Sequence, residues 1–158
     1  MIKRILFLLI AGLMSISACS SPDNVSQNTS DAGSEGITTT KSGLKYTVVA
    51  EGEGAAIKNG EIASVHYTGW LYDESAPENK GNRFDSSHDR GEPLGFPVGA
   101  GSVIKGWDEG VLGMKVGGKR ILIIPADLGY GARGFPPVIP ANSMLLFDVE
   151  LVAIGAAQ

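Results

Sequence analysis

One segment of the chain beyond residue 40, SVIKGWDEGVLGM at residues 102–114, has apolar residues at helical spacing. The positions that recur on one helix face are Val103, Ile104, Trp107 and Val111. Ser102 precedes them and is expected to cap the helix. Three glycines inside the segment each weaken it by roughly 1 kcal/mol relative to alanine. The helix is therefore expected to depend on packing, and its glycines would let a neighbouring sheet approach closely.

Two longer segments alternate between apolar and polar residues, which is the period of a strand with one covered face. In residues 61–72 the covered positions are Ala63, Val65, Tyr67 and Leu71. In residues 143–154 they are Leu145, Phe147, Val149 and Leu151. Shorter strands are expected within 43–54, 83–99 and 116–125, and residues 72–82 read as a loop. About five strands, mostly antiparallel, with one short α-helix on one face predict an α+β fold.

The stretch GYGARGFPPVIP, residues 129–140, contains the G-x-G-x-x-G pattern of dinucleotide-binding loops. That pattern needs a following helix, whose N-terminus meets the phosphates. Prolines follow here instead, at positions 136, 137 and 140, and they exclude a helix. The sequence therefore argues against nucleotide binding and predicts a long loop that projects Tyr130, Phe135, Val138 and Ile139.

The first 20 residues, MIKRILFLLIAGLMSISACS, have the form of a secretory signal peptide. Two basic residues precede an apolar run that is too short for a membrane-spanning anchor, which needs about 20 apolar residues. Cys19 is the only cysteine, so it cannot close an internal disulfide. ISAC, ending at Cys19, resembles the lipobox of bacterial lipoproteins, in which the cysteine carries the lipid. The alternative is an ordinary signal peptide with a free thiol.

The predicted domains are a signal peptide at 1–18, a lipidated cysteine with a flexible linker at 19–42, and one folded domain at 43–158. The linker range is rich in Ser, Thr, Asn, Asp and Gly and has too little apolar surface to fold alone. Cleavage before Cys19 would remove Lys3 and Arg4 and no acidic residue, so the net charge of -4 would become -6. An acidic protein of this kind makes nucleic acid an unfavourable partner.

The folded domain offers little for hydrolytic or metal chemistry. It has no cysteine and no G-x-S-x-G motif, and its two histidines are His66 and His88. We interpret His66 as a satisfied strand residue and His88 as an exposed loop residue, and two such histidines do not make a zinc site. No metal and no cofactor are expected. Aromatic residues instead stand beside glycines and turns, where their side chains can line a cavity.

The motifs VHYTGWLYD, FDSSHDR, VIKGWDEGVLGMKVGGKRILIIP, GYGARG and LLFDVELV together resemble FKBP-type peptidyl-prolyl cis-trans isomerases. The resemblance covers residues 43–154. It implies a five-stranded antiparallel sheet wrapped around a short helix, with proline-containing polypeptides as substrates. Macrolide inhibitors of the tacrolimus and rapamycin type are the expected ligands.

The resemblance also implies which residues form the site. Trp107 matches the indole under the substrate proline ring, and the backbone N–H of Ile104 would bond a substrate carbonyl. The residues implied as catalytic are Tyr67, Asp85 and Tyr130. Those implied as substrate-binding are Phe84, Arg90, Leu94, Val103, Ile104, Trp107, Phe135, Ile139 and Phe147.

The sequence departs from the family pattern at a few of these positions. Leu94 stands where well-studied members have phenylalanine, Ser102 where they have an acid, and Phe135 where a histidine is frequent. The loop at 72–82 is also longer. These differences bear on peptide preference more than on the reaction.

The implied reaction needs neither a nucleophile nor an obligatory proton donor. Rotation about an X–Pro bond faces a barrier of about 18–20 kcal/mol from amide resonance. An apolar pocket favours the twisted amide, which has lost that resonance and its charge separation. The alternative function is a binding module that binds proline-containing segments with little turnover.

Ser20 after Cys19 gives no clear signal for retention in the inner membrane. This favours the outer membrane of a bacterium, with the domain facing the periplasm or the exterior.

Overall fold

The computed structural model of the chain describes residues 36–156. The predicted signal peptide and Cys19 lie outside this range. Within it, the strands are β1 (Thr38–Thr39), β2 (Lys45–Ala50), β3 (Glu53–Ala56), β4 (Ile62–Tyr72), β5 (Lys80–Ser86), β6 (Leu94–Pro97), β7 (Lys115–Val116), β8 (Lys119–Ile124) and β9 (Leu145–Gly155). One α-helix, α1 (Lys105–Val111), and four short 3₁₀ turns complete the described part. The α+β fold of an antiparallel sheet with one helix is confirmed.

Seven strands form the main sheet in the order β1-β2-β8-β9-β4-β5, with β6 also paired to β4, and β3 pairs with β7 separately. The strand number exceeds the predicted five because short strands extend the sheet at both edges. β5 and β6 pair with successive parts of the same edge of β4, so that one interrupted strand gives two elements. The loop predicted at 72–82 is shorter than expected, since β5 already begins at Lys80.

The central pair, β4 and β9, confirms the predicted alternation. The inward positions of β4 are buried up to Gly69, while the outward His66 and Thr68 are partly exposed. On β9 the predicted inward residues Leu145, Phe147, Val149 and Leu151 are all buried. This alternation places Tyr67 and Phe147 on the covered face of adjacent strands.

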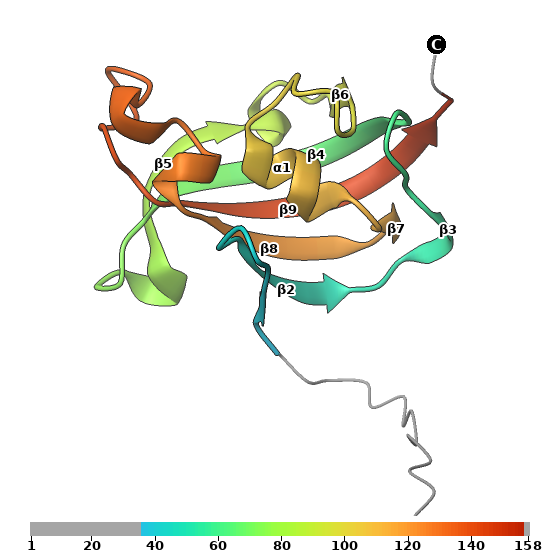
Figure 1. The fold of residues 1–158 in the computed structure, drawn as a ribbon, viewed down its shortest axis with the longest axis horizontal. Helices are drawn as coiled ribbons and strands as arrows, with labels where there is room; N and C mark the ends of the chain where they lie inside the picture. Colours follow the sequence, from blue (N-terminus) through green and yellow to red (C-terminus); the bar gives the residue numbers. More distant parts are fainter. Residues whose placement is uncertain (1–35, 157–158) are drawn as a thin grey trace, which may run out of the picture. The chain divides into compact units, whose positions relative to one another are not determined.

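Helix α1 lies across one face of the sheet (Figure 1). A Cβ at Gly106 would lie 2.6 Å from Ile124 Cγ2, and one at Gly110 would lie 2.7 Å from Leu122 Cδ1. The expectation that glycines allow a close approach of helix and sheet is therefore confirmed.

The predicted cap at Ser102 is wrong. The helix begins at Lys105, its N-cap is Ile104, and no side chain caps it. The backbone of Ile104 is extended, with φ −61° and ψ 146°. The residues before Lys105 therefore belong to the loop that enters the helix, and Ser102 lies too early to reach the first free N–H groups.

The fold takes in residues inside the range predicted as linker. Thr38 and Thr39 pair with β2, and the Thr40 N–H donates to the Leu44 carbonyl at 2.8 Å. The Ser42 hydroxyl donates to Glu109 on α1 at 2.6 Å. In the described part of the chain, helices fall short of the length and apolar character that a membrane crossing requires.

Candidate active site

A cavity of about 200 Å³ opens between α1 and the covered face of the sheet. Strands β4, β5, β6 and β9, the loop before α1, α1 itself and the loop after β8 all contribute to its wall. The lining residues are Tyr67, Phe84, Asp85, Leu94, Ser102, Val103, Ile104, Trp107, Tyr130 and Phe147.

Trp107 lies at the centre of the aromatic part of this wall and is only 3% exposed. The Tyr67 ring stands nearly perpendicular to the indole, at 83° with centroids 4.8 Å apart. The Phe147 ring does the same, at 85° and 5.2 Å. Phe84 in turn packs edge-on against Phe147 at 5.5 Å. Such edge-to-face contacts fix the rings in place, so the cavity keeps a defined apolar shape.

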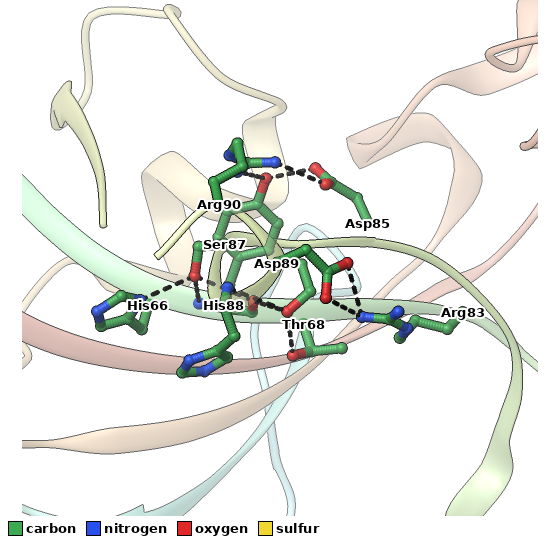
Figure 2. A network of polar contacts seen from close by, with 10 residues as sticks. His66, Thr68, Arg83, Asp85, Ser87, His88, Asp89 and Arg90 are labelled. Atoms are coloured by element: carbon green, nitrogen blue, oxygen red, sulfur yellow. Dashed lines mark hydrogen bonds and ion pairs between the residues drawn. The ribbon is translucent and has the colours of Figure 1, made fainter. Parts of the chain in front are cut away.

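A polar trio, Tyr67, Asp85 and Arg90, closes the rim. The Tyr67 hydroxyl donates a short hydrogen bond to Asp85 Oδ2. Arg90 donates from Nη2 to the Tyr67 oxygen at 2.8 Å and from Nη1 to Asp85 Oδ1 at 2.9 Å. Figure 2 shows Arg90 and Asp85 joined by one of these contacts. The trio is a closed triangle of hydrogen bonds, one of which joins the two charged groups, Arg90 and Asp85.

These contacts set the protonation states at the rim. Burial raises the pKa of the Tyr67 phenol, and the hydrogen bond to Asp85 adds to the rise. Burial also acts to raise the pKa of Asp85, but the hydrogen bonds from Tyr67 and Arg90 outweigh it and hold that pKa below its ordinary value. Burial, with Asp85 nearby, raises the pKa of Tyr130. At neutral pH the rim therefore has one carboxylate and two protonated phenols.

The loop that enters α1 is fastened to the helix by Asp108. Its two carboxylate oxygens accept the N–H groups of Gly99 and Gly101 at 2.8 and 2.9 Å. Both glycines have positive φ, 76° and 70°, a conformation that favours glycine. These two hydrogen bonds, called the Asp108 clamp below, fix the segment that brings Val103 and Ile104 to the cavity. Sequence reasoning missed Asp108; glycines at 99 and 101 followed by an acid in the helix were the available signal.

The structure brings most of the residues implied by the sequence to one cavity, and Arg90 bonds to its rim. Two lie apart from the lining. Phe135 is 57% exposed and packs against Tyr130, with ring centroids 5.7 Å apart. Ile139 is 2% exposed in a backbone bridge with Phe135, so the loop projects Phe135 and Val138 but not Ile139.

His66 and His88 form a pair on the opposite side of β4. Their rings stack 4.7 Å apart at 12°, and His66 Nδ1 lies 3.0 Å from the Ser87 hydroxyl. Sequence reasoning treated the two histidines separately and missed both the stack and Ser87. In residues 36–156, groups of three or more His, Cys, Asp or Glu side chains placed to hold a metal ion are absent.

The antiparallel sheet, its single helix and the cavity between them define a small α+β domain. Solved structures of this class match it. The crystal structure of FkpA from Escherichia coli aligns with a TM-score of 0.68 and 43% identity, covering 79% of this chain and 54% of that one. The chain thus spans about half of FkpA. The crystal structure of AtFKBP13 aligns with a TM-score of 0.65 and 40% identity, covering 75% of this chain and 98% of that one.

Residues 53–152 match the family described as FKBP-type peptidyl-prolyl cis-trans isomerase. FK506-binding protein 1A of Neurospora crassa is 50% identical over 117 residues, 73% of this chain and 92% of that protein. An FK506-binding protein of Neisseria meningitidis serogroup A is 54% identical over 104 residues, 66% of this chain and 89% of that protein. The chain belongs to the FKBP-type family and is a peptidyl-prolyl cis-trans isomerase.

Proposed function

We propose that this isomerase accelerates rotation about X–Pro bonds in exported polypeptides and that the cavity above Trp107 receives the proline ring. The observation that carries the proposal is the aromatic wall of the 200 Å³ cavity, in which Tyr67 and Phe147 stand perpendicular to the buried indole. A pyrrolidine ring is a compact, puckered and largely apolar body of a size that such a cavity can enclose.

The chemistry follows from the difference between the planar and the twisted amide. Uncatalysed isomerisation takes tens to hundreds of seconds because the C–N bond has double-bond character. The twisted amide has lost that resonance and carries less charge separation, so an apolar enclosure favours it over the planar ground state. Ile104 is the N-cap of α1, so the helix does not use its N–H, which can bond a substrate carbonyl.

The rim residues take polar roles in this scheme. Asp85 and Arg90 are held against the Tyr67 hydroxyl, so the polar side of the cavity is rigid before substrate binds. Tyr130 lines the same cavity and its phenol stays protonated, so it can donate a hydrogen bond to a carbonyl that turns towards it. Such preorganised donors stabilise the transition state because they need not reorganise during the reaction.

A protease-coupled assay with short Leu-Pro and Phe-Pro peptides tests these roles. Trp107→Ala and Asp85→Ala are expected to lower turnover. Asp89→Ala is the matched control for Asp85, since it removes an acid from the turn that follows β5, where it pairs with Arg83 instead. Wild-type turnover in both site variants would refute the site. Proline peptides that bind the wild-type protein without faster isomerisation would favour the binding-module alternative.

We extend the macrolide ligand to this chain as part of the proposal. Relatives over 50% identical carry the name FK506-binding protein, and the residues that line this cavity lie within the matched range. FK506 is expected to compete with the peptide substrate. Inhibition should weaken in Trp107→Ala and persist in Asp89→Ala, and noncompetitive inhibition would place the macrolide elsewhere.

Membrane attachment through Cys19 rests on the sequence. We propose that the signal peptide is cut before Cys19 and that lipid on this cysteine tethers the chain to a bacterial membrane, the outer membrane being favoured. Several acyl chains would hold it stably, whereas one holds marginally. Labelling cells with a tagged fatty acid should mark the wild-type chain and leave Cys19→Ser unmarked; an unlabelled wild-type chain would refute the claim.

A further inference from the structure

The edge of β4 has a gap in its backbone pairing beside the active site. β5 ends at Ser86 and β6 begins at Leu94, and both pair with β4 on this edge. Tyr67 lies between the two paired parts, so it has no strand partner there. The Ser87 hydroxyl takes the place of that partner: it accepts the Tyr67 N–H at 2.9 Å and lies 3.3 Å from the Tyr67 carbonyl oxygen.

Ser87 also begins the turn that carries Arg90. Its side chain is fully buried, and its carbonyl accepts the Arg90 N–H at 3.1 Å. On the outer side His66 Nδ1 meets the same hydroxyl at 3.0 Å, and His66 is stacked on His88 (Figure 2). A hydroxyl has one hydrogen to donate, so when it donates to the Tyr67 carbonyl, His66 must donate to it from Nδ1.

Ser87 therefore ties together two chain segments that meet again at the cavity rim. One segment is β4, whose Tyr67 side chain points inward, and the other is the turn that ends in Arg90. Their side chains meet at 2.8 Å, and both contact Asp85. A shift of the turn relative to β4 would open this triangle. The Ser87 hydroxyl holds the turn against the Tyr67 N–H, and the neighbouring Ser86 hydroxyl adds a bond to the Tyr67 carbonyl at 3.1 Å.

We propose that Ser87 is a positioning residue for the isomerase site, holding Tyr67 and Arg90 in the geometry that the rim requires. This inference rests on the proposed function of that rim. Ser87 itself lines neither the cavity nor its mouth, so its effect would pass through the backbone of β4 and of the turn.

The test compares Ser87→Ala and Ser87→Cys with the wild-type full-length chain. Both variants remove the strong hydrogen bonds; alanine leaves a small gap, whereas cysteine fills the buried position with a slightly larger atom that bonds weakly. We expect kcat/KM for an X-Pro peptide to fall by about tenfold, since a misplacement of ~1 Å in a site can cost ~100-fold. The second readout is the titration of the Tyr67 phenol by NMR of ¹³C-labelled tyrosine, with Tyr67→Phe assigning the signal. The Tyr67 pKa should move from its raised value towards 10.0.

Ile57→Val is the matched control, because it trims a buried residue outside the cavity and should keep both readouts. Variants of Ser87 that keep kcat/KM within about twofold of wild type would overturn the proposal. So would lower activity with an unchanged Tyr67 titration, since that pattern marks a general structural loss. If Ser87→Ala does not fold, Ser87→Cys decides. Wild-type turnover in Asp85→Ala would instead count against the proposed function itself.

Discussion

Asp85 links the charge of the cavity rim to the stability of the fold. Its folded-state pKa is held below 3.8 by hydrogen bonds from Tyr67 and Arg90, against the effect of burial. The pKa of Asp85 is lower in the folded state than in the unfolded state. The ionised carboxylate therefore stabilises the fold at any pH above 3.8, and this stabilisation is lost as the pH falls through the folded-state pKa. Asp85→Asn is therefore expected to be less stable than wild type at neutral pH and to lose that difference in acid.

Urea denaturation across this acid range measures the effect on the free energy of unfolding. The difference at neutral pH is expected to be about 1 kcal/mol or less, because both charged side chains are partly exposed. Asp89→Asn, in the turn that follows β5, reports the general effect of removing a nearby carboxylate. If the difference in free energy of unfolding between wild type and Asp85→Asn stays constant as the pH falls, the lowered pKa does not belong to Asp85.

Trp107 has two roles that a single substitution cannot separate. It lines the cavity and is also part of the core, at 3% exposure. Truncation of a buried tryptophan to alanine costs about 3–5 kcal/mol, a large share of the ~5–15 kcal/mol that stabilises a domain. We expect Trp107→Phe to lower turnover with a smaller loss of stability than Trp107→Ala. Thermal unfolding beside the peptide assay checks this, and full turnover in Trp107→Phe would show that the indole is not needed.

At the residue scale, sequence patterns were informative where a side chain faces a sheet or a cavity. Alternation along β4 placed Tyr67 inward because side chains alternate across a strand. Ser87 and Asp108 escaped notice because their partners are backbone N–H groups brought close only by the fold. Ile139 was expected to project with its loop, but the bridge to Phe135 turns it into the core.

Helix α1 depends on contact with the sheet more than on its own propensity. Alanine at Gly106 would gain about 1 kcal/mol of intrinsic helix propensity. The added Cβ would, however, lie 2.6 Å from Ile124 Cγ2 and 3.0 Å from its Cγ1. Because Ile124 is a fully buried branched side chain, the overlap cannot be relieved cheaply. We expect Gly106→Ala to destabilise the protein by about 1–3 kcal/mol, as overpacking does.

Chemical denaturation of Gly106→Ala tests this balance. Lys105→Ala is the control, since it places alanine at an exposed position of the same helix and should change stability by less than about 0.5 kcal/mol. A Gly106→Ala protein more stable than wild type would mean that propensity outweighs packing here.

The loop before α1 depends on Asp108. Asp108→Ala would leave the N–H groups of Gly99 and Gly101 without their acceptor and release the segment that carries Val103 and Ile104. Since these residues line the cavity, we expect KM for proline peptides to rise by about 5- to 20-fold, the equivalent of ~1–2 kcal/mol. Glu109→Ala, one residue further along the helix, should leave KM near wild type. An unchanged KM in Asp108→Ala would show that the loop holds its shape without the clamp.

At the element scale, periodicity identified the helix and the main strands but not where they begin. Val103 and Ile104 fit the helical spacing, yet they precede the helix, which begins only at Lys105 after the extended residue Ile104. Short edge strands were missed because β1 has only two residues and no pattern of its own. The break between β5 and β6 is set by pairing with β4, which no local signal reports.

For the whole molecule, the class of fold followed from consistency between independent segments. With one helix and several alternating strands, the apolar faces can be buried in only one way: the helix packs on one face of the sheet as a second layer. The N-terminal limit of the domain was harder to predict. Residues 36–42 are polar except for Gly36 and Ile37 and look like the linker that precedes them. Backbone pairing with β2 and the contact of Ser42 with α1 nevertheless bring the segment into the fold.

A pair of truncated chains tests that limit. One begins at Gly36 and keeps β1, and the other begins at Gly43, the boundary expected from composition. The shorter chain loses the β1–β2 pairing, the bond from Thr40 to Leu44 and the bond from Ser42 to Glu109. At about 0.5–1.5 kcal/mol for each net hydrogen bond, we expect it to be less stable by roughly 1–3 kcal/mol.

Both truncated chains should keep the kcat/KM of the full-length protein for short peptides, because residues 36–42 are not among those that line the cavity. Urea denaturation of the two chains gives the comparison in free energy of unfolding. Equal stability would mean that residues 36–42 are linker, as their composition suggests, and that β1 adds nothing to the fold. A loss of kcat/KM in the chain that begins at Gly43 alone would instead mean that the bond between Ser42 and α1 reaches the cavity through Glu109 and its neighbour Asp108.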